Sequence, residues 1–453
     1  MLQLTRGTLD YENVSTRFLI NEKDLRDNCF QRQFFHAYRA RASIMRPKII
    51  AAAKEKFVTD EDFLEFEDEN QIVHLTGAID MDDVATGCVI GLRGTQLRDD
   101  IFRVDEIIWP KMAIQPPLPQ LATDKYLMFV SGLSFSGETE KDAERLFSLD
   151  LLQKWIGGYL PLCNKIYCKN GLAAIYHFAI RYLMFVSGLS FSGETEKDAE
   201  RLFSLDLLQK WIGGYLPLCN KERSLVENIV RLIVAGESVA ITDQGREFTT
   251  AARYVIKNEE CPNVECAAHM DKFFSKVSSL LEVDVMPGLG DPATHLMPQQ
   301  PIHRAVFPNA SYHGKMLNLV TNPYYFTLNG IHIMGTSGNN VSDLKRFSTK
   351  ASSTDILERI LLWQHLAPTV PDTVDGFPFI DRDPFIIEDA FPHILFAANQ
   401  SVAESTVREF EGGRRTLLVS VPSFAKTKSA LLVNLRTLEV IEQNFTFDDD
   451  MIS

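Results

Sequence analysis

The residues best placed for chemistry lie at the ends of apolar strands predicted in the second half of the chain. Four of these strand ends carry Ser187, Glu237, Asp291 and Asn399 as their polar groups. In open α/β sheets, reactive and binding groups gather at the carboxyl ends of the strands. These four positions are therefore where a catalytic or metal site is expected.

Hydrolysis with two metal ions would need several Asp, His and Asn ligands that converge on ions about 4 Å apart. Only Glu237 and Asp291 supply carboxylates at these ends, and none of the four ends supplies a histidine. Two carboxylates alone cannot hold two divalent ions. The sequence therefore predicts no metal, no cofactor and no catalytic residue. Ser187, Glu237, Asp291 and Asn399 are interpreted as vestiges of a lost site.

Two other patterns could bind a ligand. Gly335–Asp343 (GTSGNNVSD) follows a strand as a phosphate loop would, but it lacks the Gly-Lys-Ser/Thr ending that supplies a cation. A tight structural turn is favoured over an anion site. Cys261, Cys266 and His269 could supply three zinc ligands, yet the spacing is unusual and no fourth ligand is near. A helix entry with a packed cysteine is the favoured interpretation.

Composition indicates an ordinary globular protein of two to three domains: 453 residues, 45% hydrophobic and 23% charged. The net charge of −14 argues against an unaided grip on phosphate backbones, since Lys and Arg drive such binding. Seven scattered cysteines and no signal peptide indicate a reducing compartment. No apolar run reaches the roughly 20 residues of a membrane span. A soluble, intracellular protein is expected.

A forty-residue block occurs twice without a difference, at residues 126–165 and 182–221. Each copy predicts a strand, a Gly/Ser turn and a helix, and one α/β domain offers a single place for such a unit. Solenoid repeats are numerous and divergent, unlike this pair. A recent exon duplication or a faulty gene model is favoured over a tandem array. The sequence leaves open which copy occupies the native strand.

Residues 1–57 are expected to form an N-terminal helical segment. Its helix, predicted over Phe34–Ile50, places Phe35, Tyr38, Ala42 and Met45 on an apolar face. Arg39, Arg41 and Arg46 lie on the other face, where solvation is favoured over a phosphate-binding or import role. Pro47 is expected to end or kink the helix.

Residues 58–120 are expected to form a partial oligonucleotide-binding-type barrel and a linker. An acidic run, Asp60–Glu69, precedes three short strands predicted at Ile72–Thr76, Cys88–Leu92 and Phe102–Trp109. A complete barrel of this type needs five strands. Four prolines between residues 110 and 119 then form a stiff linker.

Residues 121–453 show alternating strand and helix patterns, and continuous apolar strands indicate a sheet covered on both sides by helices. One predicted helix is Cys266–Leu281 and another lies around residues 196–211. The predicted strands are Tyr182–Val186, Ile229–Ala235, Val283–Met286, Leu317–Val320, Ile331–Met334, Ile394–Ala397, Thr416–Val421 and Ala430–Leu435.

Several stretches of the chain carry a family signature: Val283–Pro292, Met297–Pro308, Leu319–Asp343, Ala367–Thr373, Asp381–Ile387, Pro392–Gln400 and Leu417–Val440. Together with the opening helix, they resemble the second, non-catalytic (B-type) subunits of DNA polymerase delta. The resemblance covers nearly the whole chain outside the duplicated insert. The run from Val283 to Asp343 is specific enough to favour delta over the corresponding subunits of the other replicative polymerases.

The resemblance implies an α/β fold in which an inactive calcineurin-like phosphoesterase domain, a β-sandwich flanked by helices, follows an N-terminal oligonucleotide-binding-type β-barrel. The barrel is expected to be truncated, because few residues separate the opening helix from the acidic run. The implied partners are the catalytic subunit of the polymerase, through its C-terminal module, and the third, clamp-binding subunit. DNA is then contacted only through the complex, in the nucleus. Two alternatives are an active metallophosphoesterase or exonuclease and an autonomous single-strand DNA binder.

Overall fold

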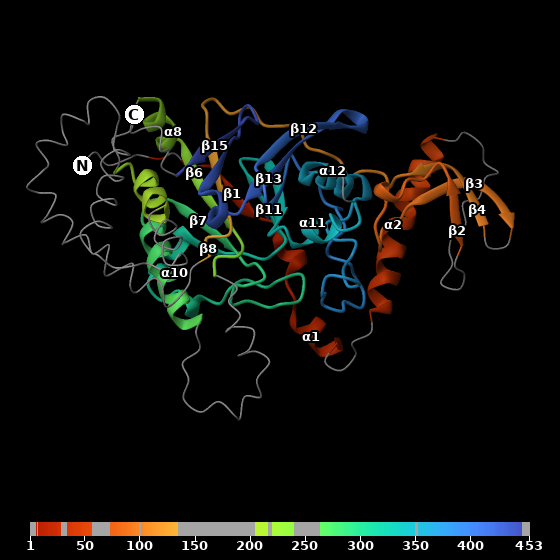
Figure 1. The fold of residues 1–453 in the computed structure, drawn as a ribbon, viewed down its shortest axis with the longest axis horizontal. Coiled ribbons are helices and arrows are strands. Elements are labelled where there is room, and N and C mark those ends of the chain that lie inside the picture. The colour runs from red at the N-terminus through yellow and green to blue at the C-terminus, as the bar shows by residue number, and fades with distance from the viewer. Residues whose placement is uncertain are drawn as a thin grey trace, which may run out of the picture.

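The computed structural model describes residues 6, 8–28, 34–56, 73–98, 101–134, 204–215, 220–239, 263–348 and 352–445. Figure 1 shows an elongated molecule in which two central sheets lie between helices, with a small third sheet at one end. Among the described helices, none is long and apolar enough to cross a membrane. The two sheets between helices agree with the expected α/β class and with the expected sandwich flanked by helices.

The first sheet has six strands in the order β1-β9-β10-β11-β13-β12. Strands β10 and β11 pair in parallel, as do β11 and β13, while β9 and β12 pair antiparallel with their neighbours. The strands are β1 (Tyr11–Asn13), β9 (Tyr324–Leu328), β10 (Ile331–Thr336), β11 (Ile394–Gln400), β12 (Glu404–Phe410) and β13 (Arg414–Pro422).

The second sheet has the order β15-β14-β5-β6-β7-β8, and the run from β5 to β8 is parallel. Its strands are β5 (Tyr126–Val130), β6 (Ile229–Ala235), β7 (Glu282–Met286), β8 (Leu317–Leu319), β14 (Ser429–Asn434) and β15 (Val440–Asn444). All seven predicted strands from Ile229–Ala235 onward are confirmed in place. The sequence missed β1, β9, β12 and β15.

The two sheets pack face to face, because alternate side chains of each strand point into the space between them. Phe129 of β5 and Phe396 of β11 meet there with ring centroids 4.8 Å apart. The outer face of the second sheet is covered by α8 (Asn220–Glu227), α10 (Asn263–Ser278) and a helix at residues 204–212. The outer face of the first sheet is covered by α11 (Asn339–Leu344) and α12 (Ser353–Trp363).

The remaining described elements are short helices and 3-10 turns. They are α1 (Glu22–Asn28), α13 (Phe424–Thr427) and the 3-10 turns η1 (Ser15–Phe18), η2 (Met81–Asp83), η3 (Arg304–Val306), η4 (Ala310–Met316) and η5 (Glu411–Gly413).

The two identical blocks each contribute one element. The strand β5 comes from the first copy, and the helix at residues 204–212 comes from the second. The predicted strand Tyr182–Val186, the first half of the helix expected around residues 196–211 and the linker at 166–181 lie outside the described residues.

The opening helix α2 (Phe35–Lys56) is longer than predicted, and of the expected end or kink at Pro47 the end is not observed, because Pro47 lies inside the helix. Ser43 and Pro47 are both exposed, so the carbonyl that Pro47 leaves without a helical donor is open to water. Beyond Pro47 the helix is stabilised by packing, since Ile49 and Ala53 form a cluster with Ile108 of the small sheet.

The buried face of α2 also differs from the prediction. Its buried residues are Arg41, Met45, Ile49 and Ala53, whereas Phe35 is 49% exposed. Arg41 was expected to be solvated and is 2% exposed. Its Nε lies 2.6 Å from Asp383 Oδ2, and its other nitrogens donate to the carbonyls of Gly87, Pro368 and Val370. The buried face of α2 therefore differs from the face that its apolar residues predict, because Arg41 binds a residue distant in the sequence.

The small sheet contains the three strands expected of a partial barrel, in the order β2-β4-β3. They are β2 (His74–Gly77), β3 (Gly91–Arg98) and β4 (Ile101–Ile108), so the second strand was predicted several residues too early. Gly94 lies inside β3 where the register shifts against β4. A side chain there would meet the Arg103 carbonyl at 2.0 Å, which explains the glycine. The acidic run Asp60–Glu69 lies outside the described residues.

Residues 1–57 are not a separate helical segment, because β1 pairs antiparallel with β9 of the large sandwich. Arg6 reinforces this attachment by donating to the carbonyls of Ile212, Val226 and Leu280. A strand of three residues carries too little alternation to be detected in the sequence.

A buried polar network lies beside β1. Arg231, 2% exposed, pairs with Asp284 at 2.5 Å and with Glu282. The guanidinium lies over the ring of Tyr11, 3.8 Å from its centroid, and Tyr324 donates to Asp284 at 2.8 Å. Every charged group in this network has an opposite partner, as burial requires. The network links the N-terminal strand to β6, β7 and β9.

Candidate functional site

The strand ends converge at one edge of the sandwich. Ser187 lies outside the described residues, and Ser131, its identical counterpart in the first copy, follows β5. The backbone N–H of Asn399 donates to Ser131 Oγ at 3.0 Å, and Ser131 Oγ donates to the Pro422 carbonyl at 2.9 Å. Glu237 and Asp291 follow the neighbouring strands β6 and β7. The described members of the predicted set therefore lie at one edge of the sandwich.

Asn399 joins the two sheets at this edge. Its Nδ2 donates to the carbonyl of Ala235 on β6 at 3.0 Å and to that of Ser337, just after β10, at 2.9 Å. The residue adopts a left-handed backbone with φ 56°, which Asn tolerates better than most residues. The amide nitrogen is a donor that these two carbonyls use, so Oδ1 is the only atom of this side chain that could accept or bind a metal. The other amide atom, Oδ1, is buried without a described partner.

Asp291 is held by backbone amides. Its Oδ1 accepts from Val239 N at 2.9 Å and its Oδ2 from Gly288 N at 2.8 Å. Burial raises the pKa of Asp291 to about 6, although these backbone hydrogen bonds act to lower it. Because its two oxygens accept from Val239 and Gly288, Asp291 holds the loop after β6 against the loop after β7.

Glu237 is the second carboxylate at this edge. It is half-buried with φ 53°, and burial raises its pKa while Lys426 acts to lower it. The loops approach closely here, because a side chain on Gly288 would meet Glu237 N at 2.4 Å.

A second network of neutral side chains was not anticipated from the sequence. Asn322 accepts from Ser337 N at 3.0 Å through Oδ1 and donates through Nδ2 to Ser337 Oγ at 2.7 Å and to Gln299 Oε1 at 2.8 Å. Gln299 in turn donates to the Gly288 carbonyl at 3.1 Å. Both residues lie in the runs that carried the family resemblance, but nothing in their spacing indicated that they would meet.

The donor set at this edge does not fit a pair of divalent cations. It consists of serine hydroxyls, the Asn322, Gln299 and Asn399 carboxamides, whose nitrogens donate to neighbouring groups, the Asp291 carboxylate bonded to two amides, and the half-buried Glu237 carboxylate. Over the part of the chain that the structure describes, no group of three or more His, Cys, Asp or Glu side chains is placed to hold a metal ion. The arrangement can stabilise loops and hold two sheets together.

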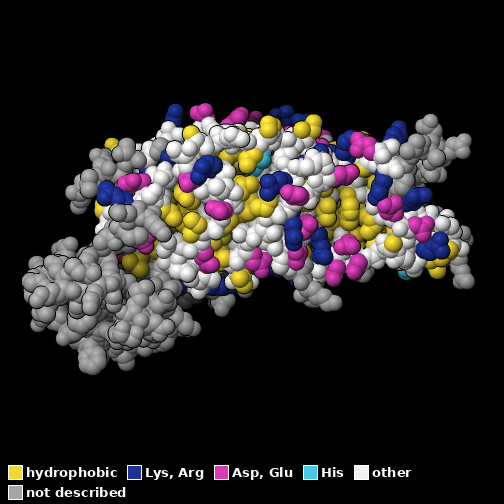
Figure 2. Space-filling model, turned by 90° about the horizontal axis from the view of Figure 1, so that it is seen from above, with side chains coloured by type: hydrophobic (Ala, Val, Ile, Leu, Met, Phe, Trp, Pro, Cys, Tyr) yellow, Lys and Arg dark blue, Asp and Glu magenta, His cyan; other side chains and the backbone are white. Residues whose placement is uncertain are grey.

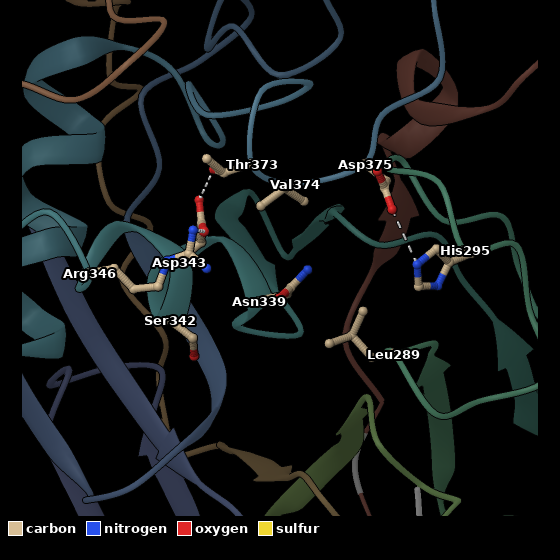
Figure 3. A pocket seen from close by; sticks show the side chains of 9 residues that line it. All are labelled: Leu289, His295, Asn339, Ser342, Asp343, Arg346, Thr373, Val374 and Asp375. Atoms are coloured by element: carbon tan, nitrogen blue, oxygen red, sulfur yellow. Dashed lines mark hydrogen bonds and ion pairs between the residues drawn. The ribbon is translucent and has the colours of Figure 1, made fainter. Parts of the chain in front are cut away.

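A cavity of about 370 Å³ adjoins this edge (Figure 3). Asp343 of α11 forms an ion pair at 3.0 Å with Arg346, which follows the helix, and Thr373 donates to Asp343. Across the cavity, His295 lies 3.5 Å from Asp375, and both side chains are mostly exposed. The two acidic side chains that line the cavity, Asp343 and Asp375, thus each lie beside a basic side chain.

The Gly335–Asp343 segment forms the turn between β10 and α11. Gly338 has φ 91°, and its N–H is 3.3 Å from Thr336 Oγ1. A side chain on Gly338 would meet the Ala398 carbonyl at 1.7 Å, so the turn packs directly on β11. These contacts support the structural turn over the anion site.

The possible zinc ligands are only partly described. Cys266 is 3% exposed in the hydrophobic cluster beneath α10, and His269 lies on the same helix, while Cys261 lies outside the described residues. Cys266 is a packed cysteine, as expected.

Comparisons with known proteins relate the chain to the B-type subunits of replicative DNA polymerases. A family model that describes the B-type subunits of DNA polymerases alpha and epsilon matches residues 183–406. Another, described as the OB-fold domain of a DNA polymerase delta subunit, matches residues 51–107. The second match begins inside α2, so it includes the helical turns that pack on the small sheet.

Relatives from animals and plants indicate which of the replicative polymerases this B-type subunit resembles. A probable DNA polymerase delta small subunit of Caenorhabditis elegans is 28% identical, with 96% of this chain and 97% of the relative covered. DNA polymerase delta subunit 2 of Drosophila melanogaster is 32% identical over 87% of this chain and 76% of the relative. The small subunit of Oryza sativa subsp. japonica is 30% identical over 89% and 79%. The chain belongs to the family of DNA polymerase delta small subunits, the accessory subunits of this replicative polymerase.

Proposed function

We propose that the chain is a non-catalytic scaffold in the DNA polymerase delta holoenzyme in the nucleus. Its large unit is an inactive calcineurin-like phosphoesterase domain whose metal ligands have been replaced, and its small unit is an oligonucleotide-binding-type barrel. It bridges the C-terminal module of the catalytic subunit and the third, clamp-binding subunit in replication and repair synthesis. The polymerase activity belongs to the catalytic partner.

The observation that carries this proposal is the bonding of Asn399 and Asp291 to backbone groups where a two-metal hydrolase needs several acceptors aimed at its ions. The Nδ2 of Asn399 donates to carbonyls of β6 and of the turn after β10, which leaves Oδ1 as the one acceptor of this side chain. Asp291, the buried carboxylate at the same edge, has both oxygens bonded to backbone amides. These side chains support a framework role.

Contact with DNA through partners is supported by charge. The chain carries 60 acidic and 46 basic residues. On the face seen in Figure 2, described basic and acidic side chains are interspersed, with hydrophobic ones between them. Phosphate binding depends on concentrated Lys and Arg. A fluorescence-anisotropy titration with single-stranded DNA at low salt is therefore expected to be flat.

The enzymatic question is tested with the purified full-length chain, bis(p-nitrophenyl) phosphate or single-stranded DNA, and Mn²⁺. We expect no release of nitrophenol or nucleotides above buffer, while an active metallophosphoesterase assayed in parallel turns over. Turnover abolished by Asp291→Ala would instead establish the alternative, a working hydrolase.

The scaffold role has its own test. Co-expression with the catalytic subunit should give a stoichiometric complex that survives gel filtration, and the third subunit should join only when this chain is present. A catalytic subunit that binds the third subunit equally well without this chain contradicts the bridging role.

A further inference from the structure

Helix α2 stands between the sandwich and the small sheet, and its charge is opposite in sign to that of the chain (Figure 1). Its 22 residues include six basic side chains and one acidic side chain, whereas the whole chain has a net charge of −14. Three of the basic side chains bond to groups of the sandwich or of the small sheet: Arg41, Lys48 and Lys56. The other three have a different setting.

These three lie on one exposed side of the helix, which we call the α2 outer face. Its members are all exposed and follow one another at intervals of three or four residues: Phe35, Arg39, Ala42, Arg46, Ile50 and Lys54. Such intervals place side chains along one side of a helix. The outer face is therefore a stripe about 29 Å long in which apolar side chains alternate with cations.

The helix itself supplies no carboxylate to neutralise these cations. A helical side chain interacts with residues three and four positions away, and no residue at these distances from Arg39 or Lys54 is acidic. Within the part of the chain that the structure describes, the Arg39 and Lys54 side chains make no hydrogen bond or ion pair. Their positive charge is therefore available to a group outside the chain.

The apolar members of the outer face are open to contact. Phe35 is 49% exposed and Ile50 is 38% exposed. A single exposed apolar side chain is ordinary on a protein surface, but here such side chains recur between cations along one stripe. Ala42, in the middle of the stripe, has a small side chain, and small side chains let two helix axes approach more closely.

The alternation fits an amphipathic helix of a partner protein in which carboxylates flank a row of apolar side chains. The apolar row would cover the apolar members of the outer face, and the carboxylates would pair with its basic members. Both helices then present side chains at intervals of three or four residues, so their contacts stay in register over several turns. Nucleic acid fits less well, because three cations offer few phosphate contacts and the chain as a whole is acidic.

We propose that the α2 outer face is a docking surface for an acidic amphipathic helix of a partner protein. The opposite side of α2 is fixed by the buried Arg41–Asp383 pair and by the packing of Ile49 and Ala53, so the stripe is presented on a rigid support. In the holoenzyme the partner is another polymerase subunit. That identification rests on the proposed scaffold function, whereas the chemistry of the docking helix does not.

A peptide titration tests the chemistry on the purified full-length chain. The probe is a fluorescein-labelled helical peptide of about 20 residues, with Leu on one face and Glu at the flanking positions. A matched peptide has Lys in place of each Glu. We expect the acidic peptide to bind and the basic peptide not to bind.

Charge reversal then locates the binding. Arg39→Glu combined with Lys54→Glu should weaken binding of the acidic peptide by about tenfold or more and allow the basic peptide to bind. The control is Lys276→Glu combined with Lys315→Glu, which makes the same change in net charge at exposed positions of α10 and η4. This control should leave the affinity within about twofold. Because all four side chains are exposed, each variant should keep the thermal midpoint of the unsubstituted chain.

Two outcomes of the titration would overturn the proposal. In one, the acidic peptide fails to bind the unsubstituted chain or binds the variant with both outer-face substitutions equally well. In the other, duplex DNA binds the unsubstituted chain more tightly than the acidic peptide and loses affinity in the same variant, which would make the stripe a phosphate-binding surface.

Carbodiimide cross-linking of the co-expressed polymerase subunits locates the partner. This reagent joins an amine to a carboxylate in direct contact, and Lys54 supplies the amine of the outer face. We expect mass spectrometry to find Lys54 joined to Asp or Glu of another subunit, in a segment whose apolar residues recur every three or four positions. A complex that assembles with no such cross-link, and equally well with the outer-face variant, overturns the proposal and leaves the scaffold function intact. A complex that does not assemble contradicts the scaffold function, and the peptide titration then decides the proposal.

Discussion

At the residue scale, the strand-end edge is held together by hydrogen bonds of the Asn399 and Asp291 side chains. Asn399 has both amide hydrogens bonded to carbonyls from different sheets. Asp291 has both oxygens bonded to amides, yet as a carboxylate it still bears the cost of a buried charge. The two residues therefore respond differently to pH, because only Asp291 titrates.

Asp291→Asn tests this cost. Burial raises the folded-state pKa of Asp291 to about 6 from an ordinary value near 3.8. A carboxyl with a raised pKa contributes stability below its unfolded pKa and loses it as pH rises through the folded pKa. The wild type should therefore lose about 3 kcal/mol relative to Asp291→Asn between pH 4 and pH 8. Urea unfolding of both proteins at each pH measures this difference, and a difference that does not change with pH contradicts the raised pKa.

Arg41→Met tests the buried ion pair between α2 and the large unit. Burial alone would raise the pKa of Asp383, but His365 and Arg41 outweigh it and hold the pKa well below its usual range. Removing Arg41 leaves this buried carboxylate without its guanidinium partner, with hydrogen bonds to His365 and the Phe385 N–H remaining, and should cost about 3–5 kcal/mol. The matched control is Arg39→Met on the same helix, where Arg39 is exposed. Equal losses in urea unfolding free energy for the two variants would show that the pair does not matter.

At the scale of elements, the sequence predicted what depends on local pattern. Ile229–Ala235 was predicted residue for residue, because a strand buried on both faces is a continuous apolar run. Strand β12 was missed because its side chains alternate between exposed and half-buried positions and include Glu404, Arg408 and Glu409. The rotation of α2 was missed because Asp383, which binds Arg41, lies more than 300 residues away.

The same limit applies to the candidate site. Strand ends are visible as apolar runs that stop, so the four candidate positions could be predicted to share one edge, where Glu237, Asp291 and Asn399 are observed. The partners of these residues could not, since Asn322, Gln299 and Ser337 meet only after three loops have folded. A hydrogen-bond network across loops leaves no periodic trace in the sequence.

Helix α12 carries a local signal that was available and overlooked. Ser352 accepts from the Asp355 backbone N–H, and the Asp355 side chain accepts from Ser352 N, which forms a capping box. Ser352→Ala should cost about 1 kcal/mol. Ser342→Ala in α11, at an exposed position, serves as the control and should cost less than about 0.5 kcal/mol. Thermal unfolding compares the two, and an unchanged midpoint for Ser352→Ala contradicts a contribution from the box.

At the scale of the whole molecule, segments distant in the sequence complete one another. The opening residues supply an edge strand to the first sheet, α2 connects the sandwich to the small sheet, and the second sheet combines strands from residues 126–130 with those from 429–444 (Figure 1). Stability is therefore spread over contacts of long sequence separation, and removing an end of the chain should affect its centre.

Deleting residues 1–20 tests this dependence. The deletion removes β1, the Arg6 hydrogen bonds and the Tyr11 ring that lies over Arg231. It uncovers the Arg231–Asp284 pair of β6 and β7. It also leaves β9 as an exposed edge strand, which invites association. We expect a loss of about 2–4 kcal/mol and concentration-dependent aggregation, read by urea unfolding and light scattering. Tyr11→Phe, which keeps the ring but loses the hydrogen bond to Tyr324, should cost only about 1 kcal/mol. A truncated chain as stable as the full one would show that the sandwich is complete without its first strand.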